Sequence, residues 1–86
     1  MQISYEFVPH WKEKLVCKCA QGNFILDYAM GSPTVYLPAK NRWETVAPDW
    51  SHEHWESIYT QLSDWCSKNK VALAIDAYAE HKLETE

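Results

Sequence analysis

The chain has 86 residues, of which 47% are hydrophobic and 23% are charged, a composition that fits one globular domain and argues against disorder. Its two glycines exclude a Gly-rich phosphate-binding loop. The net charge of −4 is uneven, because residues 1–43 carry +2 and residues 44–86 carry −6. An acidic half repels nucleic acid and anionic membranes and favours a basic protein partner, although a solvated surface that only aids solubility explains it equally well.

The start of the chain and its cysteines bear on the compartment. Met1 is followed by alternating polar and apolar residues instead of the apolar core of a signal peptide, and no stretch approaches the length of a membrane-spanning helix. The cysteines are odd in number, and Cys17 and Cys19 lie two apart on a predicted strand, where they pair poorly as a disulfide. We therefore expect a reduced, cytoplasmic protein.

The first half of the chain alternates apolar and polar residues in four short segments, the pattern of half-buried strands. The segments are residues 3–8, ending at Pro9; 14–20; 24–30; and 34–37, ending at Pro38. Trp11 is expected at the tip of the first connection, and Gln21-Gly22-Asn23 and Gly31-Ser32-Pro33 are turn sequences. Short connections between consecutive strands predict an antiparallel meander that begins with Ile3 on its buried side.

Residues 38–50 are expected to be irregular, with a brief extended piece at 43–46. Residues 51–68 then predict one long amphipathic helix, with Ser51 as its N-cap and Asn69 as its left-handed end. Trp50 and Trp55 occupy the positions of a hydrophobic staple. The apolar face of the helix recurs at steps of three and four: Trp55, Ile58, Tyr59, Leu62, Trp65 and Cys66.

Residues 71–78 predict a last strand, apolar enough to be buried on both faces, although residues 72–80 can also be a helix because alanine favours it. Residues 81–86 form a polar tail that we expect to be loose. The predicted fold is α+β: a single domain, residues 1–80, with an antiparallel four- to five-stranded meander sheet and one long amphipathic helix packed on one face. The other face of the sheet is left to solvent or to a partner.

A zinc site is the first chemistry to consider, because two thiols and two imidazoles suit that metal. Cys17 and Cys19 are separated by one residue, as are His52 and His54. Residues two apart on a helix point in nearly opposite directions, so the histidines do not converge. We expect core thiols, first-turn histidines, no metal and no cofactor.

A nucleophilic enzyme needs a Cys or Ser beside a His and an acid. Cys66 lies on the apolar helix face, Ser51 is better explained as a cap, and His10 has no partner at a recognisable spacing. Glu53 and Glu56 resemble a carboxylate pair, but acidic first turns of helices are common. We expect no enzymatic activity.

Nucleic-acid binding is disfavoured, since the basic, aromatic patch is small and the net charge is negative. That patch consists of Trp11, Lys12, Lys14 and Lys18. Protein binding is the remaining class. Aromatic anchors beside carboxylates suit a binder of a basic cleft, although Trp43 and Trp50 can instead close the core under their loop. The candidate partner-binding residues are Trp43, Glu44, Asp49, Trp50, His52, Glu53 and Glu56.

The sequence Trp43-Glu44-Thr45-Val46-Ala47-Pro48-Asp49-Trp50 leads into the helix that bears Trp55, Ile58, Leu62 and Trp65, and a strand follows. This layout resembles small bacterial immunity proteins of polymorphic toxin systems, such as those encoded beside Rhs or type VI secretion effectors. The resemblance implies an intracellular protein that binds a cognate toxin domain and blocks its active site, and it assigns no binding residue.

Two hypotheses follow. The first is an immunity protein whose acidic residues steer it toward a basic or nucleotide-binding cleft of the toxin. The second is a structural or regulatory domain without catalytic activity that self-associates, as a homodimer for example, through an exposed face or edge of the sheet. A toxin gene immediately upstream supports the first, and a concentration-dependent homodimer supports the second.

Overall fold

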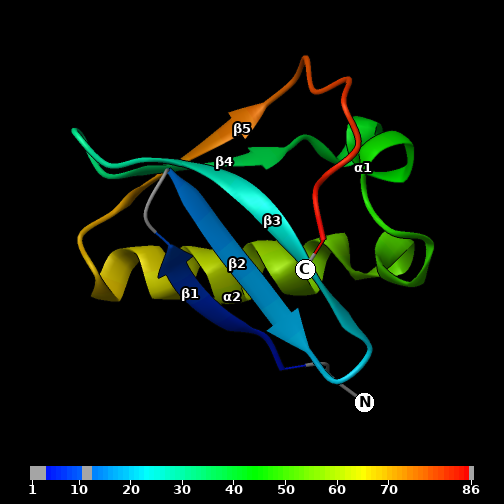
Figure 1. Ribbon diagram of the computed structural model, residues 1–86, viewed down its shortest axis with the longest axis horizontal. Helices are drawn as coiled ribbons and strands as arrows, with labels where there is room; N and C mark the ends of the chain where they lie inside the picture. Colours follow the sequence, from blue (N-terminus) through cyan, green and yellow to red (C-terminus); the bar gives the residue numbers. More distant parts are fainter. Residues whose placement is uncertain (1–3, 11–12, 86) are drawn as a thin grey trace.

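The computed structural model describes residues 4–10 and 13–85, so the predictions made for Ile3, Trp11 and Lys12 lie outside the described residues. The α+β class is confirmed. Five strands form one sheet in the order β1-β2-β3-β4-β5, and one long helix, α2 (Trp55–Lys68), lies along one face of it (Figure 1).

The first four strands form the predicted antiparallel meander: β1 (Glu6–His10), β2 (Lys14–Cys19), β3 (Gly22–Ala29) and β4 (Thr34–Pro38). The prediction that Pro9 ends the first strand is wrong, because β1 continues through it. The N–H of Tyr5 points away from β2 and donates to Oε1 of Gln61 at 2.8 Å. Backbone groups alternate sides along a strand, so Pro9 also turns its nitrogen outward and costs the sheet no hydrogen bond.

The last pair of strands differs from the prediction. β5 (Ala72–Asp76) is a strand, so the helical alternative is wrong, but it pairs with β4 in parallel. The chain between them passes through helices and returns to the same end of the sheet, which a parallel pair requires. β5 is also the last strand in the sheet order, and Ile75 is 46% exposed. The predicted burial on both faces is therefore wrong.

The predicted irregular region contains two helices. Residues 43–46 are not extended, because they belong to helix α1 (Lys40–Val46), and a 3-10 helix, η1 (Asp49–His54), follows. Trp43 and Val46 are the buried residues of α1, and its C-cap Ala47 is buried as well, so the three have the spacing of one helix face. Burial of this face outweighs the strand preference of Trp, Thr and Val that suggested an extended piece.

The predicted beginning of the long helix is also wrong. α2 starts at Trp55, not after Ser51, and Ser51 is buried in η1, where its hydroxyl donates to the carbonyl of Pro48 at 2.7 Å. Trp55 is thus the first residue of α2, and its Nε1 donates to the carbonyl of Pro38 at 2.9 Å, so it forms no staple with Trp50. At the other end, Lys70, not Asn69, adopts the left-handed conformation.

The core lies between α2 and the sheet face that it covers, which we call the helix face. The apolar period of α2 is confirmed at Ile58, Leu62 and Cys66, which are buried. Trp55 and Trp65 pack against the core while partly exposed, and Tyr59 is exposed. The strands contribute alternate residues to the helix face: Phe7, Leu15, Cys17, Phe24, Leu26, Val35 and Leu37.

The prediction of a loose tail is wrong for residues 81–85. The N–H of Leu83 donates to the carbonyl of Val46, and the N–H of Ile25 donates to the carbonyl of Glu84, each at 2.8 Å. The pairing of β4 with β3 reaches no further than Asp27, so the amide of Ile25 is free for the tail. Leu83 packs against the core, and the tail thereby joins β3 to α1.

Candidate functional site

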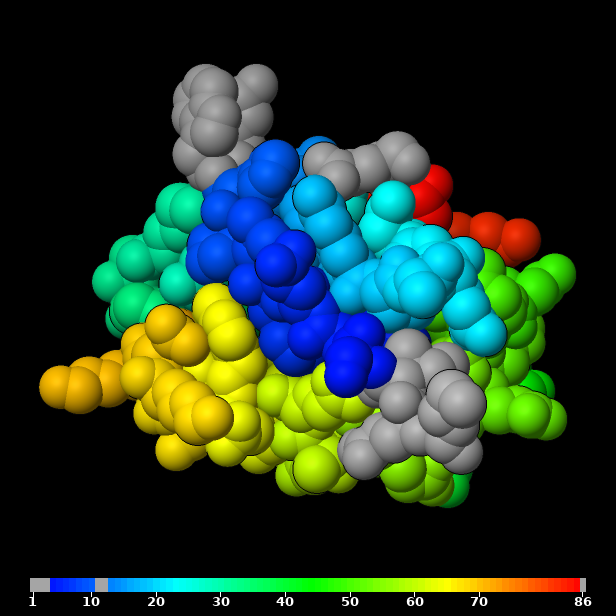
Figure 2. All heavy atoms as spheres, turned by 90° about the horizontal axis from the view of Figure 1, so that it is seen from below, coloured from blue at the N-terminus to red at the C-terminus, as the bar shows by residue number. Residues whose placement is uncertain are grey.

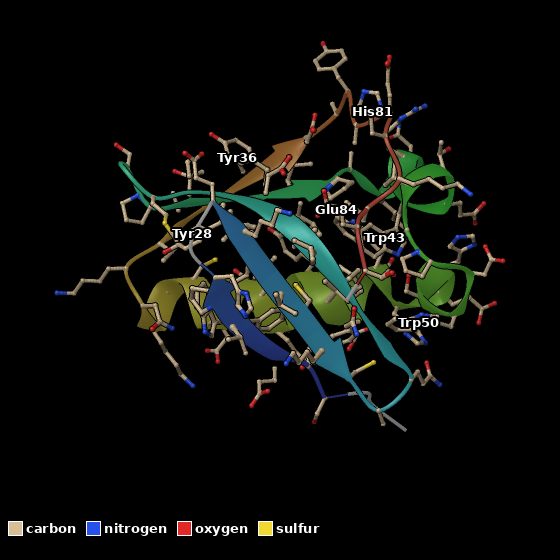
Figure 3. The ribbon with its side chains drawn as sticks, in the orientation of Figure 1. Tyr28, Tyr36, Trp43, Trp50, His81 and Glu84 are labelled. Atoms are coloured by element: carbon tan, nitrogen blue, oxygen red, sulfur yellow. The ribbon has the colours of Figure 1, made fainter. Side chains whose placement is uncertain are left out.

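The seven predicted partner-binding residues lie on three consecutive elements, α1, η1 and the first turn of α2. We call residues 39–54, which join β4 to α2, the crossover. The structure places the tryptophans and the acids of this segment on opposite sides of it, and Glu56 lies just beyond it, on α2. The inner side of the crossover faces the sheet and carries the tryptophans, whereas its outer side carries carboxylates and is open to solvent (Figure 3).

Trp43 belongs to the inner side. It is 1% exposed, its ring meets that of Phe24 edge to face at 5.4 Å between centroids, and its Nε1 donates to the carbonyl of Ser51 at 2.8 Å. The indole therefore joins α1 to η1 through the core. A side chain with almost no exposed surface cannot anchor a partner, so Trp43 closes the core instead.

Trp50 is half-buried and packs over the β2–β3 hairpin. Gly22 has a φ of +153°, and a Cβ built on it would lie 3.0 Å from the indole of Trp50. The ring of Trp50 also lies 6.2 Å from that of Phe24 and 6.1 Å from that of His54. Gly22 thus lets the indole approach the backbone, and most of the ring is used to hold η1 against the sheet.

The outer side carries Glu44 on α1 and Asp49 and Glu53 on η1, all exposed. The carboxylate of Asp49 lies 3.7 Å from Nε2 of His52, and its side chain is fully accessible at 105%. Within residues 4–10 and 13–85, no salt bridge is present at Glu44 or Glu53. Glu44 and Glu53 therefore project negative charge without an ion-pair partner among the described residues, and Asp49 adds a third exposed carboxylate beside His52.

Glu56, in the first turn of α2, differs from these three acids. Its carboxylate accepts a hydrogen bond from Nζ of Lys40, which lowers the pKa of Glu56 below its usual value. The pair fixes the start of α1 to the start of α2 and neutralises the charge of Glu56. Sequence reasoning missed Lys40, since the two residues are sixteen apart and only the crossover brings them together.

The histidines of the crossover serve its structure. Nε2 of His52 donates to the carbonyl of Ala47 at 3.0 Å, and Nδ1 of His54 lies 3.2 Å from the hydroxyl of Tyr5. Sequence reasoning also missed Arg42, whose Nε donates to the carbonyl of Ala79 at 2.8 Å and ties α1 to the chain after β5. The hydrogen bonds from Arg42 to Ala79 and from Leu83 to Val46 thus connect the crossover to the chain that follows β5.

A groove of about 810 Å³ lies between β1 and α2, which lie against each other in Figure 2. Phe7 and Trp65 supply its aromatic wall, and their rings lie 6.1 Å apart. Tyr5 also lines the groove, and burial, followed by the influence of Cys19, raises the pKa of its phenol. A phenol that keeps its proton does not act as a general base, so Tyr5 contributes packing and a hydroxyl group to the groove.

The residues considered for a zinc site are Cys17, Cys19, His52 and His54. Cys17 is a buried free thiol and Cys19 a half-buried one. Cys66, which was considered as a nucleophile, is also a buried free thiol, and burial raises the pKa of Cys17 and of Cys66, assisted for Cys17 by Cys66. Among residues 4–10 and 13–85, no three His, Cys, Asp or Glu side chains are grouped to hold a metal ion. His52 and His54 are engaged by Ala47 and Tyr5, as described above.

Comparison with known protein families, curated proteins and solved structures finds no match. No helix in the described part of the chain is long and apolar enough to cross a membrane. The fold and the chemistry of its surface therefore carry the functional argument.

Proposed function

We propose that this chain is a bacterial immunity protein that binds a cognate toxin domain and neutralises it by occluding its active site. One observation carries the proposal: the carboxylates of Glu44, Asp49 and Glu53 are exposed on a crossover whose inner side is fixed by the core. Preorganised charges of one sign lose little freedom on binding and accelerate encounter with a surface of opposite sign.

The chemistry of the three acids defines the partner. Three exposed carboxylates on one segment complement a cleft lined by lysines or arginines, the type of cleft that binds phosphate groups. A toxin domain that acts on a nucleotide or a nucleic acid has such a cleft. Insertion of the crossover would exclude the substrate without any catalytic step, so the chain needs no cofactor and no metal for this role.

Carboxylates, and not tryptophans, make the contact in this proposal. Trp43 is buried and Trp50 packs over Gly22, so the aromatic anchors expected from the sequence serve as the support of the acidic surface. His52 supports the surface as well, because its ring caps the carbonyl of Ala47 beside Asp49. Glu56 contributes less than the other acids, since Lys40 already pairs with it.

The proposed compartment is the cytoplasm, where an immunity protein meets a toxin that has entered or was made in the same cell. Three free cysteines are compatible with that reducing environment.

Co-expression with the protein encoded by the neighbouring reading frame tests the function. We expect the chain to restore growth of cells that make this protein and to co-purify with it in a one-to-one complex. A matched pair of variants locates the contact: Glu44, Asp49 and Glu53 changed together to Lys should abolish rescue, whereas the same changes at the exposed Glu6, Glu13 and Glu80 should leave it intact.

The two triple variants have the same net charge, so total charge alone cannot explain a difference between them. Absence of both rescue and co-purification with the unaltered chain would contradict the immunity function. Equal rescue by the two variants would remove the outer side of the crossover from the contact.

A further inference from the structure

The free edge of β5 carries backbone groups that the sheet does not use. The N–H of Ala72 donates to the carbonyl of Pro33, and the carbonyl of Asp76 accepts from the N–H of Ala39. Backbone groups alternate along a strand, so Ala72, Ala74 and Asp76 face β4 and Leu73 and Ile75 face outward. No further strand follows β5 in the sheet order of the described residues.

The opposite edge of the sheet is protected against the addition of a strand. Beside β1, the outward N–H of Tyr5 donates to the side chain of Gln61. Pro9, which also faces outward, has no N–H to offer to another strand. Charges and prolines are the usual protection of sheet edges. β5 has neither proline nor lysine, and its one charged residue, Asp76, lies at its end. The two edges therefore differ, and only β5 is equipped to pair.

We propose that β5 is a self-association surface, on which β5 of a second copy pairs antiparallel about a two-fold axis at Ala74. This register places Leu73 of each copy opposite Ile75 of the other, so each such pair exchanges both N–H···O bonds. Ala74 then meets its own counterpart in the close, non-hydrogen-bonded position, where a methyl group fits. The outcome is a continuous ten-stranded sheet through two copies of the five-stranded one.

Side chains and charges favour the same partner. Leu73 and Ile75 lie opposite Val35 and Leu37 in the register, on the helix face, and Ile75 is 46% exposed although Leu37 is fully buried. Pairing would cover Ile75 with Leu73 of the second copy. The antiparallel arrangement also brings the basic start of one strand, at Lys70, beside the acidic end of the other, at Asp76, whereas a parallel arrangement would align like charges.

A five-residue edge buries little area compared with a permanent dimer, so the association is expected to depend on concentration. This inference is independent of the proposed function, because the edge of β5 does not include Glu44, Asp49 or Glu53. An immunity protein can carry such an edge, and so can the self-associating domain considered from the sequence.

Sedimentation equilibrium between about 10 µM and about 1 mM tests the proposal, since weak interfaces fall in this range of dissociation constants. The mass of the unaltered chain should rise from 10.1 kDa toward twice that value. Ile75→Lys should remain a monomer at every concentration, because it places like charges across the edge. Met30→Lys is the matched control, since Met30 is similarly exposed, at 42%, on the β3–β4 turn, and it should associate as the unaltered chain does.

Amide hydrogen exchange of the unaltered chain gives a second measurement that needs no variant. The amides of Leu73 and Ile75 should exchange at least about tenfold more slowly at the high concentration than at the low one. A monomer throughout the range would overturn the proposal. It would also be overturned by association of Ile75→Lys equal to that of the control, or by association that leaves the exchange of these two amides unchanged.

Discussion

The two sides of the crossover use neighbouring residues for opposite purposes. On the inner side, Trp43, Val46, Ala47 and Ser51 are buried and join α1 and η1 to the sheet. On the outer side, Glu44 follows Trp43 directly and is exposed. Helical geometry separates the two sets, because consecutive residues on a helix point about 100° apart.

This difference separates stability from recognition. Removal of an inner side chain leaves a cavity in the core, whereas reversal of an outer charge changes little in the folded state. Partner binding should instead be sensitive to the outer charges, since only the outer side can meet a partner.

Trp43→Ala has the largest expected effect, a loss of about 3–5 kcal/mol of unfolding free energy, typical of a large aromatic residue removed from a core. The variant also leaves the carbonyl of Ser51 without its donor. Urea unfolding followed by circular dichroism measures the loss. Trp43→Phe should lose less, because its ring still fills part of the site, and an equal loss in both variants would make the hydrogen bond, and not the packing, the main contribution.

Gly22→Ala should destabilise the chain by about 1–3 kcal/mol, because the added methyl group meets the indole of Trp50 and the backbone conformation suits only glycine. Gly31→Ala is the matched control, since nothing lies within 4 Å of a Cβ there. The same urea titration compares them. A Gly22→Ala protein as stable as the Gly31→Ala protein would show that Trp50 does not hold η1 against the sheet.

Alkaline pH should weaken the core under the sheet. The pKa values of Cys17, Cys66 and Tyr5 are raised by burial, so the folded state holds these protons more tightly than the unfolded state does. The stability they contribute is complete below the ordinary values of 9.0 for a thiol and 10.0 for a phenol, and it is lost as the pH rises above them. Urea midpoints between pH 7 and pH 11 should fall from about pH 9 upward.

Cys17→Ala isolates the contribution of one thiol to this decline. The variant should be less stable at neutral pH, because a buried sulfur is removed, but its stability should decrease less between neutral and alkaline pH. A decline identical to that of the unaltered chain would show that Cys17 ionises equally easily in the folded and unfolded states.

Charge reversal of Glu44, Asp49 and Glu53 to Lys has the smallest expected effect on stability, within about 0.5 kcal/mol, because exposed charges contribute little to folding. The urea midpoint of the triple variant should match that of the Glu6, Glu13 and Glu80 variant. A loss comparable with that of Trp43→Ala would mean that the outer side is part of the structural framework and would remove the separation of the two sides.

The sequence predicts the regular parts of this fold well and the crossover poorly. Alternation over several residues identifies the first four strands, and the three-and-four spacing identifies the buried face of α2. α1 is too short for its period to be recognised, and its Trp, Thr and Val suggest a strand. The parallel direction of β5 depends on where the crossover returns the chain, which no local pattern records.

The candidate site shows the same limit. A tryptophan beside a glutamate, such as Trp43 beside Glu44, can be either an exposed anchor or a core residue, and the sequence pattern is the same in both cases. The contact of Trp43 with Phe24, which depends on the position of α1, decides for the core. The tail misleads for a similar reason. Leu83 is the single apolar residue among residues 81–86. It packs against the core because the tail is held on both sides of it, by the bond from its own N–H to Val46 and by the bond from the N–H of Ile25 to Glu84.

The most direct test of the separation is the association rate constant with the protein encoded by the neighbouring reading frame. Stopped-flow measurements at low salt should give a rate at least about tenfold lower for the Glu44, Asp49 and Glu53 to Lys variant than for the Glu6, Glu13 and Glu80 variant. The difference should shrink at about 1 M salt, where charges are screened within a few ångströms. Equal rate constants at low salt for the two variants would contradict a recognition role for the outer side.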